Sequence, residues 1–414
     1  MKPQALTTLD EALAAVLAQA LPLGVEHVDL FNADGRVLRA DCTSALQVPP
    51  QDNSAMDGYA VRVADLPAAG VALPVSQRIP AGHVGTELQP GSVARIFTGA
   101  PVPPGADAVL MQEDTTVLAD GRVQFNAMPK PGQNIRRAGE DIALASTVLA
   151  AGTRLTPAAI GLAASIGMAT LPVGRKPRVA LFSTGDELVL PGTVAPQDMR
   201  PGSIYNSNRY FLRALLQRLG CEVVDGGILP DHRAQTVEAI HRVAQDCDLV
   251  LSSAGVSVGE EDHVKPAVEQ QGALNLWMIS MKPGKPFAYG QVFRNGQDAS
   301  QGVAHFMGLP GNPVSSFITF LLLVRPFVLR LQGLQDVAPR ATTVTAQFAW
   351  PKLEKRREFL RARHDGQGGL QLFGNQGSGV LTSTVWGDGL IDNPPLTPIQ
   401  PGDSVRFIPF TELM

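Results

Sequence analysis

The chain has 414 residues, of which 44% are hydrophobic, and its 34 Lys and Arg against 38 Asp and Glu give a formal net charge of −4. This length predicts about two to four domains, and the apolar fraction suffices for several cores, which excludes an intrinsically disordered chain. The net charge is mildly acidic and the sequence has no run of basic residues, so nothing in it indicates a positive surface for a nucleic-acid backbone or an anionic membrane. We therefore expect neither partner, and an anionic ligand must meet a local positive site.

The three cysteines, Cys42, Cys221 and Cys247, lie far apart in the sequence and form no C-x-x-C pair. This pattern predicts neither a disulfide framework nor a thiolate zinc site. A reducing, cytoplasmic location fits it best.

Two stretches with helical spacing flank a segment of short β-like runs. Apolar residues from Leu9 to Ala20 recur at helical spacing, and Thr8 with Glu11 forms a capping box, unlike the apolar core of a signal peptide. Residues 155–166 are helical again, with Thr156 as N-cap and Pro157 at the first position. Between them, short β-like runs at 71–79, 92–97, 107–111 and 122–126 alternate with Pro and Gly turns. The sequence predicts one helical layer interrupted by an inserted β-rich domain.

From residue 178 onward, apolar strands alternate with amphipathic helices. Strands are expected at 178–183, 222–227, 248–253, 275–281 and 305–309, and helices at 207–219, 233–245, 262–270 and 313–323. This pattern predicts a doubly wound α/β domain, in which helices cover both faces of a parallel sheet. The apolar run 317–324 is broken by Arg325 and Pro326, short of the ~18 residues that a membrane span needs, so a buried helix of a soluble protein is expected.

Beyond residue 331, short strands at 342–349, 359–363, 370–373 and 404–409 predict a small C-terminal β domain. The expected domains are a helical linker domain (1–46 with 142–176), the inserted domain (47–141), the α/β domain (177–330) and the C-terminal domain (331–414). No internal repeat is evident.

Four loops that follow strands of the α/β domain are rich in Gly, Pro and charge: 183–187, 252–262, 282–286 and 309–313. Ligands of open parallel sheets bind at the carboxyl ends of the strands, so these loops are the expected site. The loop 252–259 has small residues and main-chain amides that open onto a helix, which suits a phosphate. Its candidate binding residues are Ser253, Gly255, Ser257 and Gly259. A tight turn selected only for sterics explains this loop equally well.

Charged residues in these loops suggest further roles. Asp186, Glu187 and Asp262 bring carboxylates to one edge, and Mg²⁺ is commonly bound by one or two carboxylates plus phosphate oxygens. The alternative is that Asp186 and Asp262 are helix caps. Lys282 and Lys285, in a loop stiffened by Pro and Gly, form a cation pair suited to a compact oxyanion, unless both are simply solvated.

At the fourth loop, Asn312 is expected to cap the helix that begins at Pro313, which leaves Ser315 as a hydroxyl donor. The seven histidines show no metal-ligand spacing, so we treat them as structural or surface residues. Ser-His-Asp hydrolysis is not expected.

Ordered motifs run through nearly the whole chain. They are N-S-A-M-D-G-Y-A at 53–60, I-F-T-G-A-P at 96–101, G-A-D-A-V at 105–109, Q-E-D at 112–114, N-I-R at 134–136, G-E-D at 139–141, G-S-I at 202–204 with Asn208, and Arg356, Glu358, Phe359 and Arg361 followed by Q-G-S-G at 376–379. Together with the four loops, they resemble the MoeA-type molybdopterin molybdenumtransferase family, which also occurs as a domain of gephyrin.

The resemblance implies an elongated homodimer of four-domain subunits, in which the C-terminal domain is β-barrel-like. Its active cleft would lie between the molybdopterin-binding α/β domain of one subunit and the inserted domain of the other. It implies a transferase that takes adenylylated molybdopterin, hydrolyses the bond to AMP in a Mg²⁺-dependent step and inserts molybdate into the dithiolene. Transient contacts with molybdopterin adenylyltransferase and with molybdoenzymes are also implied.

The resemblance also implies roles for individual residues. Catalytic positions across the dimer cleft are Asp57, Thr98 and Glu140, and those of the acidic α/β cleft are Glu187, Asp231 and Asp262. The expected metal ligands are Asp186, Glu187 and Asp262. The residues expected to hold molybdate are Lys282, Lys285, Ser315, Arg361 and Ser378.

Two positions depart from the family pattern. Ala254 stands where the family usually has Gly, so a left-handed backbone there would be strained. Met278 stands where many members have a basic residue, which shifts the attraction of anions toward Lys282 and Lys285.

Three alternatives remain open: a scaffold protein of the gephyrin E-domain type, a molybdopterin adenylyltransferase, and a phosphohydrolase of another nucleotide.

Overall fold

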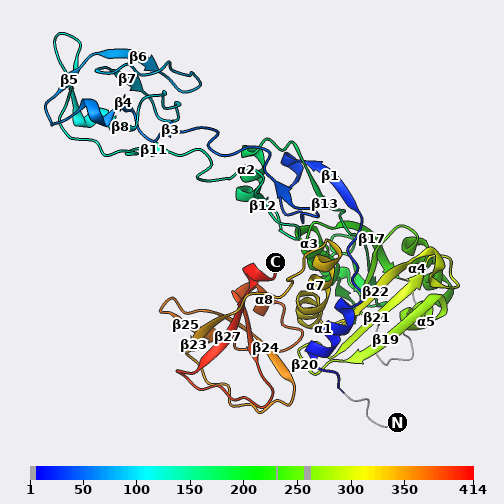
Figure 1. Ribbon diagram of the computed structural model, residues 1–414. Coiled ribbons are helices and arrows are strands. Elements are labelled where there is room, and N and C mark those ends of the chain that lie inside the picture. The colour runs from blue at the N-terminus through cyan, green and yellow to red at the C-terminus, as the bar shows by residue number, and fades with distance from the viewer. Residues whose placement is uncertain (1–5, 230–231, 256–262) are drawn as a thin grey trace.

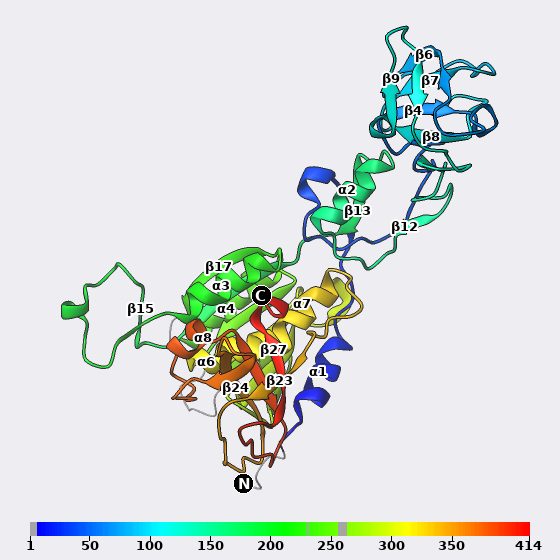
Figure 2. The ribbon, with the colours of Figure 1, turned by 90° about the vertical axis from the view of Figure 1, so that its left-hand side faces the viewer.

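The computed structural model describes residues 6–229, 232–255 and 263–414. Figures 1 and 2 show an elongated molecule, with the inserted β domain at one end and the α/β domain beside the C-terminal domain at the other. The linker elements lie between these two ends.

The α/β domain is built on a six-stranded sheet. Its order is β17 (Glu222–Leu229), β14 (Arg178–Thr184), β18 (Leu249–Ser253), β22 (Val303–Leu309), β21 (Pro286–Phe293) and β19 (Gly272–Met278). The first four strands are parallel, but β21 is antiparallel to both of its neighbours. The expectation of an entirely parallel sheet is therefore wrong at this edge. The loop between β19 and β21 is too short for a helical crossover, so the two strands form a hairpin.

Helices cover both faces of this sheet. One face packs with α3 (Asn208–Arg218) and the long helix that begins at Pro313, and the other packs with α4 (Arg233–Ala244) and α5 (Val264–Gln271). Successive residues of β14 alternate between the two cores, with Leu181 in one and Phe182 in the other. The doubly wound arrangement is thereby confirmed, because both faces of the strands are buried.

The expected break at Arg325 and Pro326 does not occur. The helix continues from α6 (Pro313–Thr319) through a π-helical turn, η6 (Phe320–Val324), into α7 (Arg325–Leu331). A π-helical turn widens the helix, and such turns are one way in which an interior Pro is accommodated. By length and composition this 19-residue helix could cross a membrane, but 89% of its most apolar window is buried inside the protein.

The two helical stretches that flank the inserted domain do not share a layer. α1 (Leu9–Leu17) has the expected capping box, but its Leu9, Ala12 and Val16 pack into the α/β core. α2 (Pro157–Ser165), capped by Thr156, packs in the linker instead. The linker strands are β1 (Val25–Asp29) paired with β13 (Thr170–Gly174), and β2 (Cys42–Thr43) paired with β12 (Thr147–Leu149).

The inserted domain consists of small antiparallel and mixed sheets. One has the order β6 (Val75–Ile79), β7 (Val93–Ile96), β4 (Gly58–Val61) and β8 (Ala108–Met111), and another has the order β5 (Ala72–Leu73), β10 (Val123–Phe125) and β9 (Thr115–Val117). β3 (Asn53–Ser54) pairs with β11 (Ile135–Arg136). The run 71–79, expected as one strand, is thus divided between two sheets at Pro74, which cannot donate to a ladder.

The C-terminal domain is a closed five-stranded barrel. The order is β24 (Arg357–His364), β25 (Gly369–Leu372), β23 (Thr342–Ala346), β27 (Ser404–Pro409) and β26 (Gly389–Asn393), and β26 pairs again with β24. α8 (Thr382–Trp386) lies beside it. β20 (Met281–Lys282) pairs in parallel with β24, so the loop that precedes β21 is joined to the barrel.

Short elements complete the chain. β15 (Leu188–Val189) and β16 (Ile204–Tyr205) pair in parallel at the base of an arm that projects from the α/β domain in Figure 2. The 3-10 turns are η1 (Leu30–Asn32), η2 (Val63–Asp65), η3 (Gln112–Asp114), η4 (Pro196–Asp198), η5 (Ala299–Gln301) and η7 (Phe410–Glu412).

Candidate functional site

A cavity of about 750 Å³ lies at the carboxyl edge of the sheet, between the α/β domain and the barrel. Described residues of all four predicted loops line it, and residues 376–378 of the barrel complete its wall. β19 runs in the same direction as β22, so its hairpin to β21 opens at this same edge. The cavity therefore lies where the strand-end argument predicts a site.

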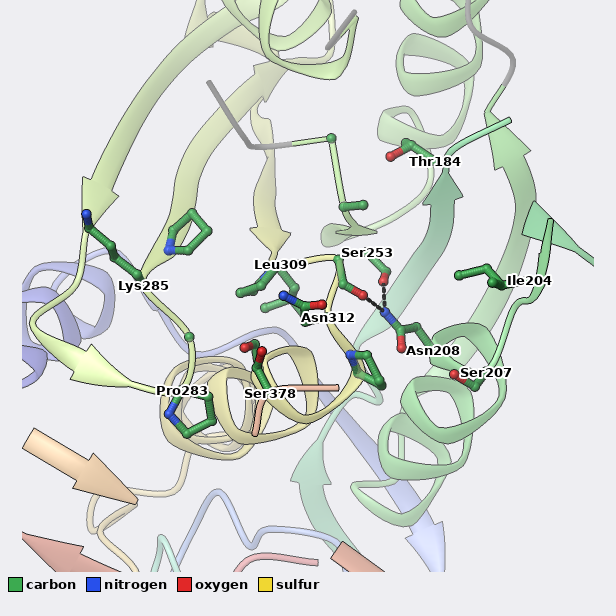
Figure 3. Close-up of a pocket in the computed structure, with 18 of the residues that line it drawn as sticks. Thr184, Ile204, Ser207, Asn208, Ser253, Pro283, Lys285, Leu309, Asn312 and Ser378 are labelled. Carbon is green, nitrogen blue, oxygen red and sulfur yellow. Dashed lines mark hydrogen bonds between the residues drawn. The ribbon is translucent and has the colours of Figure 1, made fainter. Parts of the chain in front are cut away.

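Asn208, the first residue of α3, ties two loops together. Its Nδ2 donates to Ser253 Oγ at 2.7 Å and to the Gly311 carbonyl at 2.8 Å, as the dashed lines of Figure 3 show. The Ala254 N–H donates to the Leu309 carbonyl at 3.0 Å, which joins the same two loops again. The floor of the cavity is therefore fixed by hydrogen bonds between neighbouring strand ends.

The turn after β18 has a left-handed backbone at two successive residues. Ala254 has a φ of 69° and Gly255 a φ of 77°, so the strain expected at Ala254 is confirmed. A Cβ on Gly255 would stand 2.7 Å from Val264 Cγ2 and 3.1 Å from Thr184 Oγ1. Only Gly fits there. The candidates Ser257 and Gly259 lie outside the described residues.

The two loop lysines are in different electrostatic environments. Lys282 Nζ lies 3.2 Å from Glu354 Oε2 and 3.3 Å from Glu358 Oε1, two carboxylates that the sequence analysis left without a role. Within the described residues, Lys285 forms no ion pair and lines the cavity. The uncompensated positive charge of the cavity therefore rests more on Lys285 than on Lys282.

The carboxylates around Lys282 are themselves held in place. Arg356 donates to Glu354 and, with Lys282, lowers the pKa of this carboxyl to about 2. Glu358 is buried on β24 and accepts a 2.8 Å hydrogen bond from Trp350 Nε1. The sequence signal for Glu358 was its place in the motif of Arg356, Glu358, Phe359 and Arg361. Glu354 lies in a loop with no such pattern.

Ser378 and Ser315 line the cavity, whereas Arg361 lies behind its wall. Arg361 is 1% exposed and donates to Ser383 Oγ and to the carbonyls of Phe359 and Gly377. Burial lowers its pKa to about 10. In this arrangement the guanidinium supports the loop that carries Ser378.

Asn312 is the N-cap residue of α6, but its side chain makes no capping hydrogen bond, contrary to the expectation. Its main-chain carbonyl instead accepts from the Ser316 N–H at 2.9 Å. The Asn312 side chain lines the cavity, where a ligand can reach it.

The predicted acidic residues are only partly described. Glu187 lines the cavity, whereas Asp186 is exposed and does not. Asp186 precedes β15 rather than a helix, so the cap alternative for it is wrong. Asp231 and Asp262 lie outside the described residues. Among the residues that are described, no group of three or more His, Cys, Asp or Glu side chains could hold a metal ion.

The remaining candidates belong to the inserted domain. The Thr98 N–H and hydroxyl both donate to Asp57 Oδ1, at 2.8 and 2.9 Å, and these bonds lower the pKa of Asp57. Glu140 accepts a 2.8 Å bond from the Arg137 N–H. In both views this domain lies at the end of the molecule away from the barrel, so one chain does not bring these residues to the cavity.

A second cavity, of about 800 Å³, lies between the start of α1 and the barrel. Its charged side chains are bonded to one another: Arg357 donates to both oxygens of Asp392, at 2.6 and 2.7 Å, and also to Asp10. This charge network is satisfied internally. It therefore gives no indication of a ligand, in contrast to the first cavity.

The chain is similar to known proteins along nearly its whole length. Three family models match: the MoeA N-terminal region (domain I and II) over residues 7–167, a probable molybdopterin binding domain over 180–330, and the MoeA C-terminal region (domain IV) over 343–410. A Haemophilus influenzae protein named molybdopterin molybdenumtransferase is 40% identical over 98% of this chain and 99% of its own length. A Dictyostelium discoideum protein named gephyrin is 32% identical over 79% of this chain and 50% of its own length.

Among solved structures, the molybdopterin biosynthesis moeA protein of Pyrococcus horikoshii OT3 matches with a TM-score of 0.83 and 28% identity, over 98% of this chain and 100% of that one. The relationship thus extends over all parts of the fold described above. On this evidence, the chain belongs to the molybdopterin molybdenumtransferase family, a family of transferases.

Proposed function

We propose that the protein is a molybdopterin molybdenumtransferase that inserts molybdate into adenylylated molybdopterin, with Mg²⁺-dependent hydrolysis and release of AMP. One observation carries this proposal: a single cavity combines a strand-end turn of small residues with a lysine that has no described ion pair. A phosphate and a tetrahedral oxyanion can thereby bind side by side.

The turn at Ser253, Ala254 and Gly255 is the proposed phosphate site. Turns that present main-chain N–H groups at the carboxyl end of a strand bind anions. Gly255 also lets a ligand approach the backbone closely, since it has no Cβ. The hydrogen bonds of Asn208 keep this turn in position before a ligand arrives.

Molybdate is a dianion, and the proposed site for it is the wall formed by Lys285, Ser315 and Ser378. A cation and two hydroxyl donors can replace the water around an oxyanion with charge-assisted hydrogen bonds. Lys282 has two carboxylates beside it, so we assign it chiefly the role of anchoring the loop that presents Lys285. The dithiolene sulfurs that take up the metal belong to the substrate, and no cysteine is required.

The donor set near the phosphate site fits Mg²⁺, which needs only one or two carboxylates in addition to phosphate oxygens and water. Glu187 lies on the cavity wall and Asp186 precedes it, so these two residues would hold the ion, together with Asp262. When bound, Mg²⁺ neutralises charge on the phosphates. Hydrolysis transfers a water oxygen to phosphorus and breaks one phosphoanhydride P–O bond, which releases AMP.

We further propose that the active cleft is shared between two copies of the chain. Asp57, Thr98 and Glu140 are exposed on the inserted domain, which forms one end of the molecule, and they line neither of the two cavities described above. A carboxylate with a lowered pKa stays ionised at neutral pH and can accept a proton from water or hold a cation. A homodimer that brings this end to the α/β cavity of the partner would complete the site.

The experiment is to incubate the chain with adenylylated molybdopterin, Mg²⁺ and molybdate, and to measure AMP and the molybdenum cofactor. We expect molybdate-dependent release of AMP, and Lys285→Ala should raise the molybdate concentration for half-maximal rate at least tenfold. Lys176→Ala, an exposed lysine near the opposite edge of the sheet, is the control and should leave it unchanged. Absence of AMP release would refute the proposal, and consumption of ATP with free molybdopterin would indicate the adenylyltransferase alternative.

A further inference from the structure

Asp57 and Thr98 lie on two turns at the same edge of the four-stranded sheet in the inserted domain. Asp57 directly precedes β4 and Thr98 follows β7, and because these two strands are antiparallel, the start of one meets the end of the other (Figure 1). A glycine directly follows each residue, Gly58 after Asp57 and Gly99 after Thr98. Glycine allows the backbone many conformations, so a further contact is needed to hold the pair in one position.

One side chain, Arg95 of β7, contacts both turns. Its Nη1 donates to the Gly58 carbonyl at 3.1 Å, and its guanidinium carbon lies 4.7 Å from the centre of the Phe97 ring. Gly58 is the neighbour of Asp57 in the chain, and Phe97 is the neighbour of Thr98. The guanidinium of Arg95 therefore joins the residue beside Asp57 to the residue beside Thr98.

A further contact of Arg95 leads to the main chain of Asp57. Arg95 Nη2 donates to Gln112 Oε1 at 2.6 Å, and the Gln112 N–H donates to the Asp57 carbonyl at 3.1 Å. The guanidinium carbon also lies 5.1 Å from the ring centre of Tyr59, the cross-strand partner of Arg95, which is buried. A planar cation that bonds at two edges and lies against aromatic rings has little freedom to move.

The charge of Arg95 also acts on Asp57. The hydrogen bonds from Thr98 do most to lower the pKa of Asp57, and the positive charge of Arg95 lowers it further. The two oxygens to which Arg95 donates belong to a main-chain carbonyl and a side-chain amide, which are both neutral. The guanidinium thus reaches the Asp57 turn through geometry and through charge.

We propose that Arg95 is a positioning residue, which joins the turn that carries Asp57 to the turn that carries Thr98 and so fixes the place at which this pair meets the substrate. A reacting group that is misplaced by about 1 Å can lose about 100-fold in rate, so such a link matters for turnover. The inference rests on the proposed function, in which Asp57 and Thr98 act in the cavity of the partner subunit.

Two variants test the link. Arg95→Lys keeps the charge but has no planar fork, so it cannot make both hydrogen bonds while it lies against the two rings. Arg95→Gln removes the charge as well. Arg62→Lys is the matched control, because Arg62 follows the opposite end of β4 and donates to two carbonyls, those of Gly105 and Leu88, both at 3.4 Å.

The position of the pair is measured by nuclear magnetic resonance, from the amide signal of Thr98 in the full chain with isotope-labelled threonine. A charge-assisted hydrogen bond to a carboxylate shifts an amide proton downfield, and Thr98→Ser, which lacks the label, identifies the signal. We expect the Thr98 signal to move upfield in both Arg95 variants and to stay in place in Arg62→Lys. The signals of Thr115 and Thr116, on β9 of the same domain, should not move.

The effect on the reaction is measured as molybdate-dependent release of AMP. We expect both Arg95 variants to lower kcat at least about tenfold, because the Asp57–Thr98 pair is displaced. The molybdate concentration for half-maximal rate should stay within about twofold, because Arg95 does not belong to the wall proposed to hold molybdate. Arg62→Lys should keep kcat within about twofold of the unaltered chain.

The inference is overturned if Arg95→Lys leaves the Thr98 signal and kcat unchanged, since the charge alone is then sufficient. It is also overturned if only one of these two readouts changes, because Arg95 then does not act through the position of the pair. Equal shifts at Thr98, Thr115 and Thr116 would likewise overturn it, since they indicate a general loss of structure. If the unaltered chain releases no AMP, the proposed function fails, and the Thr98 signal alone decides whether Arg95 holds the pair.

Discussion

Replacing Asn208 should release the two loops that it joins at the floor of the cavity. It should also lower the free energy of unfolding of the α/β domain. Asn208 is 8% exposed, and its Nδ2 hydrogen bonds to Ser253 and Gly311 are shorter than 2.9 Å. Asn208→Ala removes these bonds and leaves the Gly311 carbonyl and the Ser253 hydroxyl without this donor. Each net hydrogen bond contributes about 1 kcal/mol, and an abandoned buried partner costs about 1–3 kcal/mol. The expected loss in the free energy of unfolding is therefore about 2–4 kcal/mol.

The measurement is urea unfolding followed by tryptophan fluorescence. The three tryptophans, Trp277, Trp350 and Trp386, lie in the α/β domain and the barrel region, so the signal reports on the end of the molecule that contains Asn208. Asn208→Asp tests the hydrogen bonds more specifically than Asn208→Ala does. It has nearly the same shape, yet it places an acceptor opposite the Gly311 carbonyl, so it should cost at least as much as Asn208→Ala.

The control is Asn295→Ala. Asn295 Nδ2 also makes two hydrogen bonds, at 3.0 Å to Asp298 and 3.2 Å to Ser300, but in a solvent-accessible turn. Water can replace these partners, so the expected cost is below about 1 kcal/mol. If Asn208→Ala and Asn295→Ala prove equally destabilising, then burial of the Asn208 bonds is not what holds the loops, and the reasoning fails.

Two further predictions concern strain and charge. Ala254→Gly should raise the free energy of unfolding by about 0.5–1 kcal/mol, since relief of a left-handed alanine outweighs the added chain entropy; an unchanged or lower urea midpoint would contradict it. The pKa of Glu354 falls from 4.5 to about 2 because Arg356 and then Lys282 bond to it. A lowered folded-state pKa means that its carboxylate stabilises the fold above pH 4.5, and that this contribution is lost as the pH falls toward 2. Glu354→Gln should therefore lower the thermal midpoint at neutral pH and have a shrinking effect in acid, and a pH-independent difference would refute the assignment.

The sequence predicted the parts of the fold whose signals are local. The capping box at Thr8 and Glu11, and the Thr156 cap with Pro157, depend on residues a few positions apart, and both are confirmed. The strand β21 was missed because Gly290 and the following Gln291 interrupt its apolar run. Its place in the sheet is determined by pairing with β19 and β22, which no local pattern reports.

The candidate site also has parts with a local sequence signal and parts that depend on residues far apart in the sequence. The strand-end rule located the cavity because connectivity alone brings the ends of neighbouring strands together. It could not predict that Lys282 would meet Glu354 and Glu358, which come from the barrel some 70 residues later.

The two ends of the molecule differ in how firmly they are joined to the cavity. The barrel is fixed to the α/β domain by the pairing of β20 with β24 and by the Val314 N–H, which donates to the Ser378 carbonyl at 2.9 Å. The cavity wall that carries Lys285, Ser315 and Ser378 is therefore formed within one chain. The inserted domain, with Asp57, is separated from the cavity by the linker.

This asymmetry gives a test of the shared cleft. If Asp57 acts in the cavity of the partner subunit, a dimer of one Asp57→Asn chain and one Lys285→Ala chain contains one site with both defects and one site with neither. The assay uses a molybdate concentration too low for Lys285→Ala, so that neither variant is active by itself. Mixing the two variants under conditions of subunit exchange makes half of the dimers mixed, so about one quarter of the unaltered activity should return. If Asp57 instead reached the cavity of its own chain, every site would keep one defect, and the mixture would stay as inactive as its components.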